Sequence, residues 1–77
     1  MDFYERKQIG ADLIDKLVSA GSLHRKDIIF ALFKETQLGE RFVNKYLDEM
    51  ISRNFFVENA NGIISKQKDD KKTLNNA

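Results

Sequence analysis

The sequence predicts a small, mostly helical α+β domain in which three helices precede a short β-hairpin. Apolar residues recur every three or four positions in three successive segments, which is the spacing of amphipathic helices. After the third segment, Asn61-Gly62 separates two short apolar runs, the pattern of a hairpin. A chain of 77 residues forms one domain and buries little surface, so we expect a self-association or partner surface.

The first helix is expected over about residues 3–19. Asp2 followed by Glu5 matches a capping box, and Gly21 is expected to end the helix because glycine readily adopts the left-handed C-terminal conformation. Gly10 costs about 1 kcal/mol relative to alanine, so either another backbone approaches closely there or the glycine is simply tolerated. The expected buried face comprises Ile9, Leu13, Ile14, Leu17 and Val18.

The second helix is expected to begin near residue 24, with Ser22 or His24 as its N-cap, and Ser22-Leu23 before it is too short to stand as a strand alone. Its predicted buried face comprises Ile28, Ile29, Leu32 and Phe33, while Phe30 points away. A short connector at residues 36–39 follows, in which Leu38 fills the turn and Gly39 caps the third helix. The third helix is expected to end at Asn54, which tolerates a left-handed conformation, and to bury Val43, Leu47, Met50 and Ile51.

The hairpin is expected to turn at Asn61-Gly62 through a loop of two or four residues. Either loop places Val57 and Ile64 on the face of Phe55, which we expect to be buried, and Phe56, Glu58, Ile63 and Ser65 on the other face. The hairpin is expected to be separable from the three helices. Residues 68–77 are polar and are expected to form a disordered tail, so the predicted domain spans residues 1–67.

The apolar series from Leu23 to Phe56, closed by Asn61-Gly62-Ile63-Ile64, resembles a winged helix-turn-helix domain over roughly residues 5–67. The bare architecture is similar to small regulators of archaeal viruses and plasmids. Two positions depart from the pattern: Asn54 stands where the family usually has glycine, and Gly39 where it usually has serine or threonine. The resemblance implies a DNA-binding transcription regulator with its third helix in the major groove and its wing near the backbone or the minor groove. It also implies that Ser22-Leu23 serves as a third strand against the hairpin.

Composition excludes several classes of function. The chain has no cysteine and a single histidine, His24, so disulfides, thiolate metal sites and a cofactor are not expected. It also lacks a phosphate-binding glycine loop and an acid placed with a base, which argues against an enzyme or an evident small-molecule site. No membrane span or signal segment is apparent, so we expect a soluble cytoplasmic protein.

The candidate site is the outward face of the third helix. Arginine binds guanine and asparagine binds adenine, while lysine offers a charge to phosphate, so Arg41, Asn44 and Lys45 are predicted to read double-stranded DNA. Asp48 and Glu49 would repel the backbone and limit contact to the first half of the helix. Predicted backbone contacts are Arg25, Lys26, Thr36 and Gln37, and predicted wing contacts are Asn59, Asn61 and Lys66.

Two alternatives stay open at this point. The net charge of +1 and several extra aromatic residues also suit a winged helix used as a protein-interaction module of transcription or replication machinery. At the start of the first helix, Phe3 and Tyr4 have no obvious core partner. They either form a homodimer through helix 1 or fold back onto Phe56 and Ile63.

Overall fold

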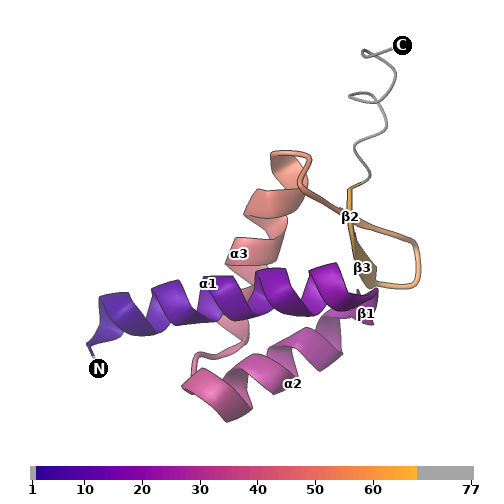
Figure 1. The fold of residues 1–77 in the computed structure, drawn as a ribbon. Coiled ribbons are helices and arrows are strands. Elements are labelled where there is room, and N and C mark those ends of the chain that lie inside the picture. The colour runs from indigo at the N-terminus through magenta and orange to yellow at the C-terminus, as the bar shows by residue number, and fades with distance from the viewer. Residues whose placement is uncertain (1, 68–77) are drawn as a thin grey trace.

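The computed structural model describes residues 2–67 and has three helices and a small three-stranded antiparallel sheet. The helices are α1 (Phe3–Ala20), α2 (Arg25–Thr36) and α3 (Glu40–Ser52). The strands are β1 (Leu23–His24), β2 (Phe56–Glu58) and β3 (Ile63–Lys66). This is the predicted, mostly helical α+β class, and the expected tail at residues 68–77 lies outside the described residues (Figure 1).

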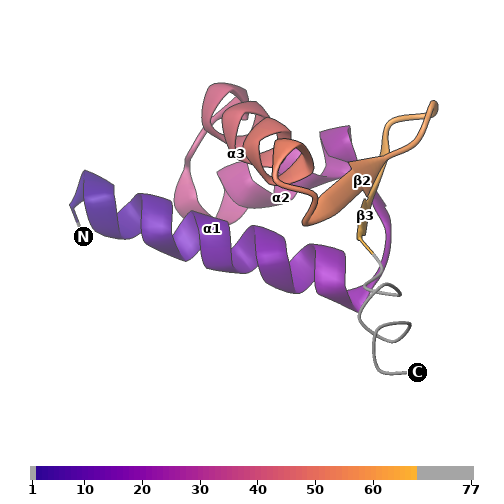
Figure 2. The same cartoon turned by 90° about the horizontal axis from the view of Figure 1, so that it is seen from above.

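Helix α1 lies along α2, while α3 runs across them and the sheet sits at the C-terminal end of α1 (Figures 1 and 2). The core gathers between these elements from residues on all three helices and on the two hairpin strands. Its buried members are Ile14, Val18, Ile28, Leu32, Val43, Leu47, Phe56 and Ile64. Because two of them come from the hairpin, the hairpin and the helices share one core.

Local sequence signals place most of the helix ends. The capping box of α1 forms, since the Glu5 amide donates to the Asp2 carboxylate at 2.8 Å and the Glu5 side chain accepts from the Asp2 amide. His24 caps α2 by accepting from the amide of Lys26 at 3.0 Å. Gly39 is the N-cap of α3, and Asn54 has the expected positive φ, 68°. The prediction of a left-handed conformation at Gly21 is wrong, because φ is 168° there and the backbone is extended.

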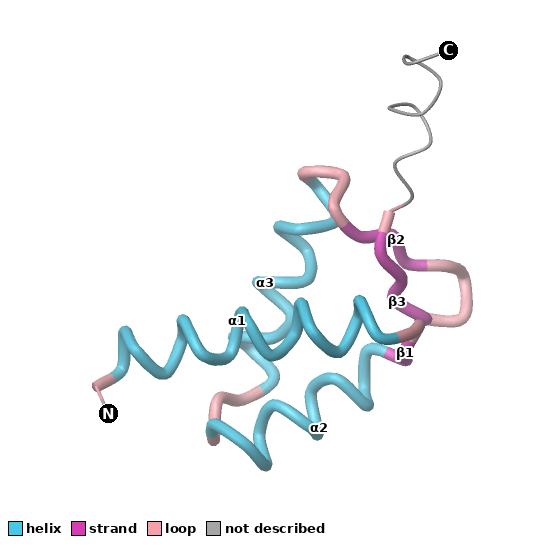
Figure 3. Tube along the Cα trace, in the orientation of Figure 1, coloured by secondary structure: helices cyan, strands magenta, loops and turns pink. Residues whose placement is uncertain are grey.

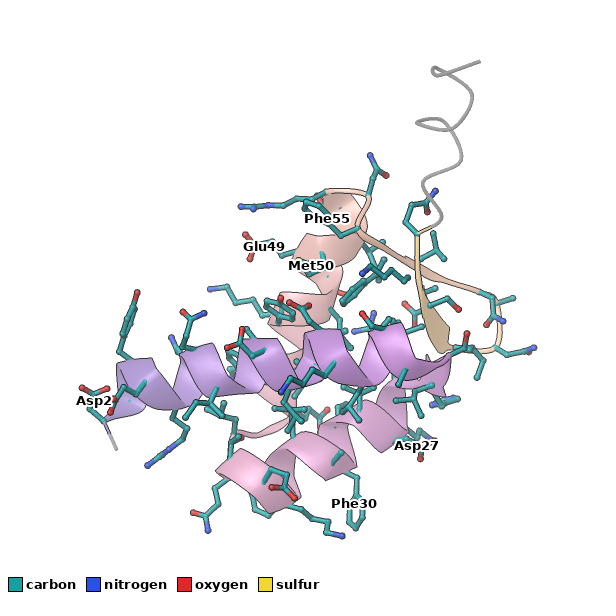
Figure 4. The ribbon with its side chains drawn as sticks, in the orientation of Figure 1. Asp2, Asp27, Phe30, Glu49, Met50 and Phe55 are labelled. Carbon is teal, nitrogen blue, oxygen red and sulfur yellow. The ribbon has the colours of Figure 1, made fainter. Side chains whose placement is uncertain are left out.

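Two predicted helix faces include residues that the structure leaves outside the core. On α1, the buried line runs through Gly10, Ile14 and Val18, whereas Ile9 is 45% exposed. On α2, Phe33 is 56% exposed, and Thr36 takes the buried position one turn after Leu32. Phe30 is exposed as expected and points away from α1 (Figure 4).

Gly10 allows a close approach, but by side chains and not by a backbone. A Cβ at this position would lie 2.7 Å from Cδ1 of Leu38 and 3.2 Å from the ring of Phe42. Leu38 belongs to the loop that joins α2 and α3, which Figure 3 shows, and Phe42 belongs to the first turn of α3. The missing side chain of Gly10 therefore lets the turn pack directly on α1.

The sheet has the order β1-β3-β2, so a third strand does pair with the hairpin, at Leu23 and His24 and not at Ser22-Leu23. The predicted hairpin faces are wrong by one residue. Val57 pairs with Ser65 and Glu58 with Ile64, which makes the loop three residues long and places Phe56 on the side of Ile64. Phe56 is therefore buried, at 3% exposure, while Val57 is 43% exposed. The physical reason is the left-handed Gly62, with φ of 83°, which is typical of three-residue loops.

Phe3 and Tyr4 are 60% and 76% exposed at the start of α1. The hairpin lies at the opposite end of this helix in both views (Figures 1 and 2). The alternative in which these rings fold back onto Phe56 and Ile63 is therefore wrong. Their exposure leaves the homodimer through helix 1 as a prediction.

Candidate functional site

The outward face of α3 presents two exposed cations, Arg41 and Lys45. They are four positions apart and so lie one above the other on the helix. Val43 and Leu47 anchor the opposite face in the core with no exposed surface. The hydrophobic side of α3 thus fixes the orientation in which its two cations meet solvent.

Arg25, the first residue of α2, joins three elements through its guanidinium group. Its Nε and Nη2 donate to the two carboxylate oxygens of Glu58 on β2, at 3.0 and 2.7 Å. Nη2 also donates to Asp48 on α3 at 3.0 Å, and Nη1 donates to Oδ1 of Asn44 at 2.8 Å. We call these four residues the Arg25 cluster. It fixes the end of α2 against both α3 and the hairpin.

The electrostatics of the Arg25 cluster follow from these contacts. Hydrogen bonding from Arg25 is the main cause that lowers the pKa of Glu58, with partial burial acting in the opposite direction. The same hydrogen bond raises the pKa of Arg25, against the effect of its own burial. One guanidinium faces two carboxylates, so the cluster as a whole is negative and offers an approaching anion no net attraction.

The Arg25 cluster changes what two predicted contact residues can do. Only 19% of the Arg25 side chain is exposed, and its donors already bind protein carboxylates. The Asn44 oxygen accepts from Arg25, which occupies one of the two groups that a bidentate contact to adenine uses. Asn44 retains its amide donors, while the oxygen has a structural role.

Thr36 and Gln37 lie together in the turn but differ in availability. The Thr36 hydroxyl donates to the Leu32 carbonyl at 2.8 Å and accepts from the amide of Leu38 at 3.1 Å. Thr36 is 8% exposed, so it closes the turn from inside. Gln37 is exposed and has a left-handed backbone, with φ of 64°.

The three residues predicted to contact DNA from the hairpin also differ in whether their side chains already make contacts within the fold. Asn59 caps its own loop, since its Oδ1 accepts from the amides of Asn61 and Ile63 at 2.8 and 3.0 Å. Asn61 is exposed within this loop. Lys66 lies at the far end of β3, where Nζ is 3.4 Å from Oγ of Ser19 on α1. Lys26, on the first turn of α2, is exposed.

Sequence reasoning missed two cations, Arg6 and Lys7, that the fold brings beside Arg41 and Lys45. All four line one hollow of about 380 Å³ between the start of α1 and the start of α3. The sequence shows that Arg6 and Lys7 are adjacent in the first turns of α1, but no neighbouring residue indicates that these turns pack next to α3. The glycine at position 10 was the one feature of the sequence that suggested another segment packs closely on α1.

Over residues 2–67, no group of three or more histidine, aspartate or glutamate side chains is arranged to hold a metal ion. Within the same residues, each helix is too short or too polar to cross a membrane. Comparison of the chain with protein-family models, with curated proteins and with solved structures gave no match.

Proposed function

We propose that the chain is a winged helix-turn-helix domain that binds double-stranded DNA sequence-specifically and regulates transcription. In this proposal α3 enters the major groove and the β2–β3 hairpin is the wing. The order of α2, a short turn, α3 and a hairpin paired with β1 supports it. So does the depth to which one side of α3 is buried, which leaves a defined outer face.

The exposed pair of Arg41 and Lys45 is the observation that carries the proposal. Both residues lie in the first half of α3, on the side opposite Val43 and Leu47. Arginine offers a planar donor pair that matches the edge of guanine, and lysine offers a point charge for phosphate. We assign base contact to Arg41 and an electrostatic contact to Lys45.

The Arg25 cluster limits the proposed contact to the first half of α3. Asp48 carries a negative charge on the next turn, and Glu58 adds another beside it. Asn44 would act as an amide donor while its oxygen holds Arg25 in place. Within the secondary set, Lys26, Gln37 and Asn61 are exposed and remain proposed contacts. Asn59 and Lys66 are exposed too, but their side chains already make hydrogen bonds within the fold.

A salt titration of DNA binding tests this function. Binding to random-sequence duplex should weaken steeply as salt increases, because neutralised phosphates release counterions. Arg41→Ala should cost about 1–3 kcal/mol on a selected site and relax preference at one base, whereas Lys45→Ala should weaken all sequences alike. Arg53→Ala is the matched control, since Arg53 is an exposed cation beyond the other end of α3, paired with Glu49 at 3.0 Å.

Unchanged DNA affinity in both the Arg41 and the Lys45 variants would rule out α3 as the contact surface. Equal losses in the Arg53 control would show that bulk positive charge, and not this face, governs binding. An affinity that hardly responds to salt would instead favour the protein-interaction module.

A further inference from the structure

A hollow of about 380 Å³ lies between the first turns of α1 and the start of α3. Phe3, Leu38 and Phe42 supply its apolar surface. A second hollow of about 140 Å³ shares Lys7, Phe42 and Lys45 with the first and extends to Tyr46 and Glu49, whose carboxylate is paired with Arg53. The two form one elongated depression between α1 and α3, which we call the α1–α3 groove. Its larger part has the volume of a typical ligand site.

Four cations surround the larger hollow: Arg6 and Lys7 from α1, and Arg41 and Lys45 from α3. Among the described residues, no aspartate or glutamate lines it. Gly39 also lines the hollow and caps α3 without a side-chain hydrogen bond, so the positive end of the helix dipole lies there too. Apolar surface and concentrated positive charge therefore occupy the same place.

We propose that the α1–α3 groove binds an acidic peptide segment of a partner protein, with one apolar side chain of that segment filling the larger hollow. Carboxylates of the segment complement the four cations, and the apolar anchor covers Phe3 and Phe42. Charge complementarity around a central apolar anchor is how protein interfaces combine affinity with specificity.

The aromatic rings of the groove favour a peptide over single-stranded nucleic acid. Nucleic acid would need open ring faces on which bases stack. Nζ of Lys7 already lies over the Phe3 ring, 4.6 Å from its centroid, and Phe42 and Tyr46 stack on each other at 6.2 Å. The available ring surface suits the irregular shape of an aliphatic or aromatic side chain better than a series of flat bases.

The groove shares Arg41 and Lys45 with the surface proposed to contact DNA. Occupation by an acidic segment would therefore displace DNA, which would make the partner a negative regulator of DNA binding. This competition rests on the proposed function, whereas peptide binding does not. The two can be measured separately.

Peptide binding is tested by calorimetry on the full chain without DNA. The probe is a short synthetic peptide of aspartate and glutamate that carries one phenylalanine. Arg6→Gln combined with Lys7→Gln should reduce its affinity at least about tenfold, and Phe3→Ser should also reduce it. Lys16→Gln combined with Lys34→Gln removes the same charge from outside the groove and should leave the affinity unchanged.

Two further probes define the contrary results. Polyglutamate of equal length should bind much more weakly, and equal affinity would overturn the assigned anchor. Oligo-deoxythymidine that binds more tightly than the peptide and loses affinity in the same variants would overturn the choice of partner. Circular dichroism of each variant confirms folding, and Phe3→Ser keeps the proposal testable if the double substitution unfolds. If the peptide binds but no variant binds DNA differently from wild type, only the proposed function fails.

Discussion

Arg25 shows how one side chain can be removed from a predicted surface by its own neighbours. Its position at the start of a helix suggests a phosphate contact, yet the guanidinium reaches Glu58 and Asp48. Hydrogen bonds between charged groups are roughly twice as strong as neutral ones, so these partners hold Arg25 firmly. At the residue scale, Arg25 joins α2, α3 and the hairpin, and this structural role takes up the donors that a phosphate contact would need.

The lowered pKa of Glu58 predicts a change in stability with pH. Because the folded-state pKa lies below its ordinary value of 4.5, the Glu58 contribution is present above that value and is lost as pH falls through the lowered pKa. Glu58→Gln should therefore be less stable than wild type at neutral pH, by about 1 kcal/mol or less since the pair is partly exposed. The difference should shrink as the pH is lowered from neutral to a value well below 4.5.

Urea unfolding of both proteins at the two pH values measures this effect. Glu35→Gln removes an exposed carboxylate elsewhere on α2 and serves as the control. A stability difference between wild type and Glu58→Gln that is independent of pH would contradict the assigned ion pair.

At the scale of elements, close packing of the α2–α3 turn on α1 depends on Gly10. Gly10→Ala gains about 1 kcal/mol of helix propensity but drives a methyl group against Leu38, which is itself 5% exposed and has little room to move. We expect a net loss of about 1 kcal/mol, measured by thermal or urea unfolding. Gly39→Ser, which meets no atom within 4 Å, should instead stabilise α3 by a few tenths of a kcal/mol. A more stable Gly10→Ala protein would show that the turn does not pack as described.

The hairpin depends in the same way on Gly62. Gly62→Val introduces a β-branched residue at positive φ and places a Cβ 3.0 Å from Nε2 of His24. Because Phe56 and Ile64 belong to the common core, the loss should reach the helices, in contrast to the separable hairpin that the sequence suggested.

Circular dichroism and amide exchange test the Gly62→Val result, with Ala60→Val in the same loop as control. Helical signal and hairpin protection should decrease together. If the helices stay fully protected while the hairpin exchanges freely, the hairpin is separable from the helices, as the sequence suggested.

At the scale of the whole molecule, exposed aromatics at the start of α1 lead us to predict a homodimer, which would bind DNA if the proposed function holds. Phe3 and Tyr4 are large apolar side chains without a place in the core. In the proposed function a single α3 would make few base contacts, and two-fold symmetry would double them over half-sites about 34 Å apart. Phe3→Ala with Tyr4→Ala should weaken both self-association and DNA binding, whereas Phe30→Ala should leave both unchanged.

Sedimentation of the free protein and of its DNA complex decides between monomer and dimer. One protomer per site with no second binding event would exclude the dimer. Tyr4→Ala alone also separates the dimer from peptide binding, because Tyr4 does not line the α1–α3 groove while Phe3 does.

The sequence by itself determined the order and type of the elements and most of their ends. These depend on neighbours within one helical turn, such as Asp2 with Glu5, or on a single residue such as Asn54, so they are readable locally. It also identified the helix that would carry an exposed Arg41 and Lys45. Tertiary structure decided the rest. The three-residue loop set which hairpin face is buried, and the Arg25 cluster joined residues that are 19 to 33 positions apart. Packing at Gly10 brought Arg6 and Lys7 beside α3. Such contacts depend on how elements meet in space, which periodicity and propensity do not encode.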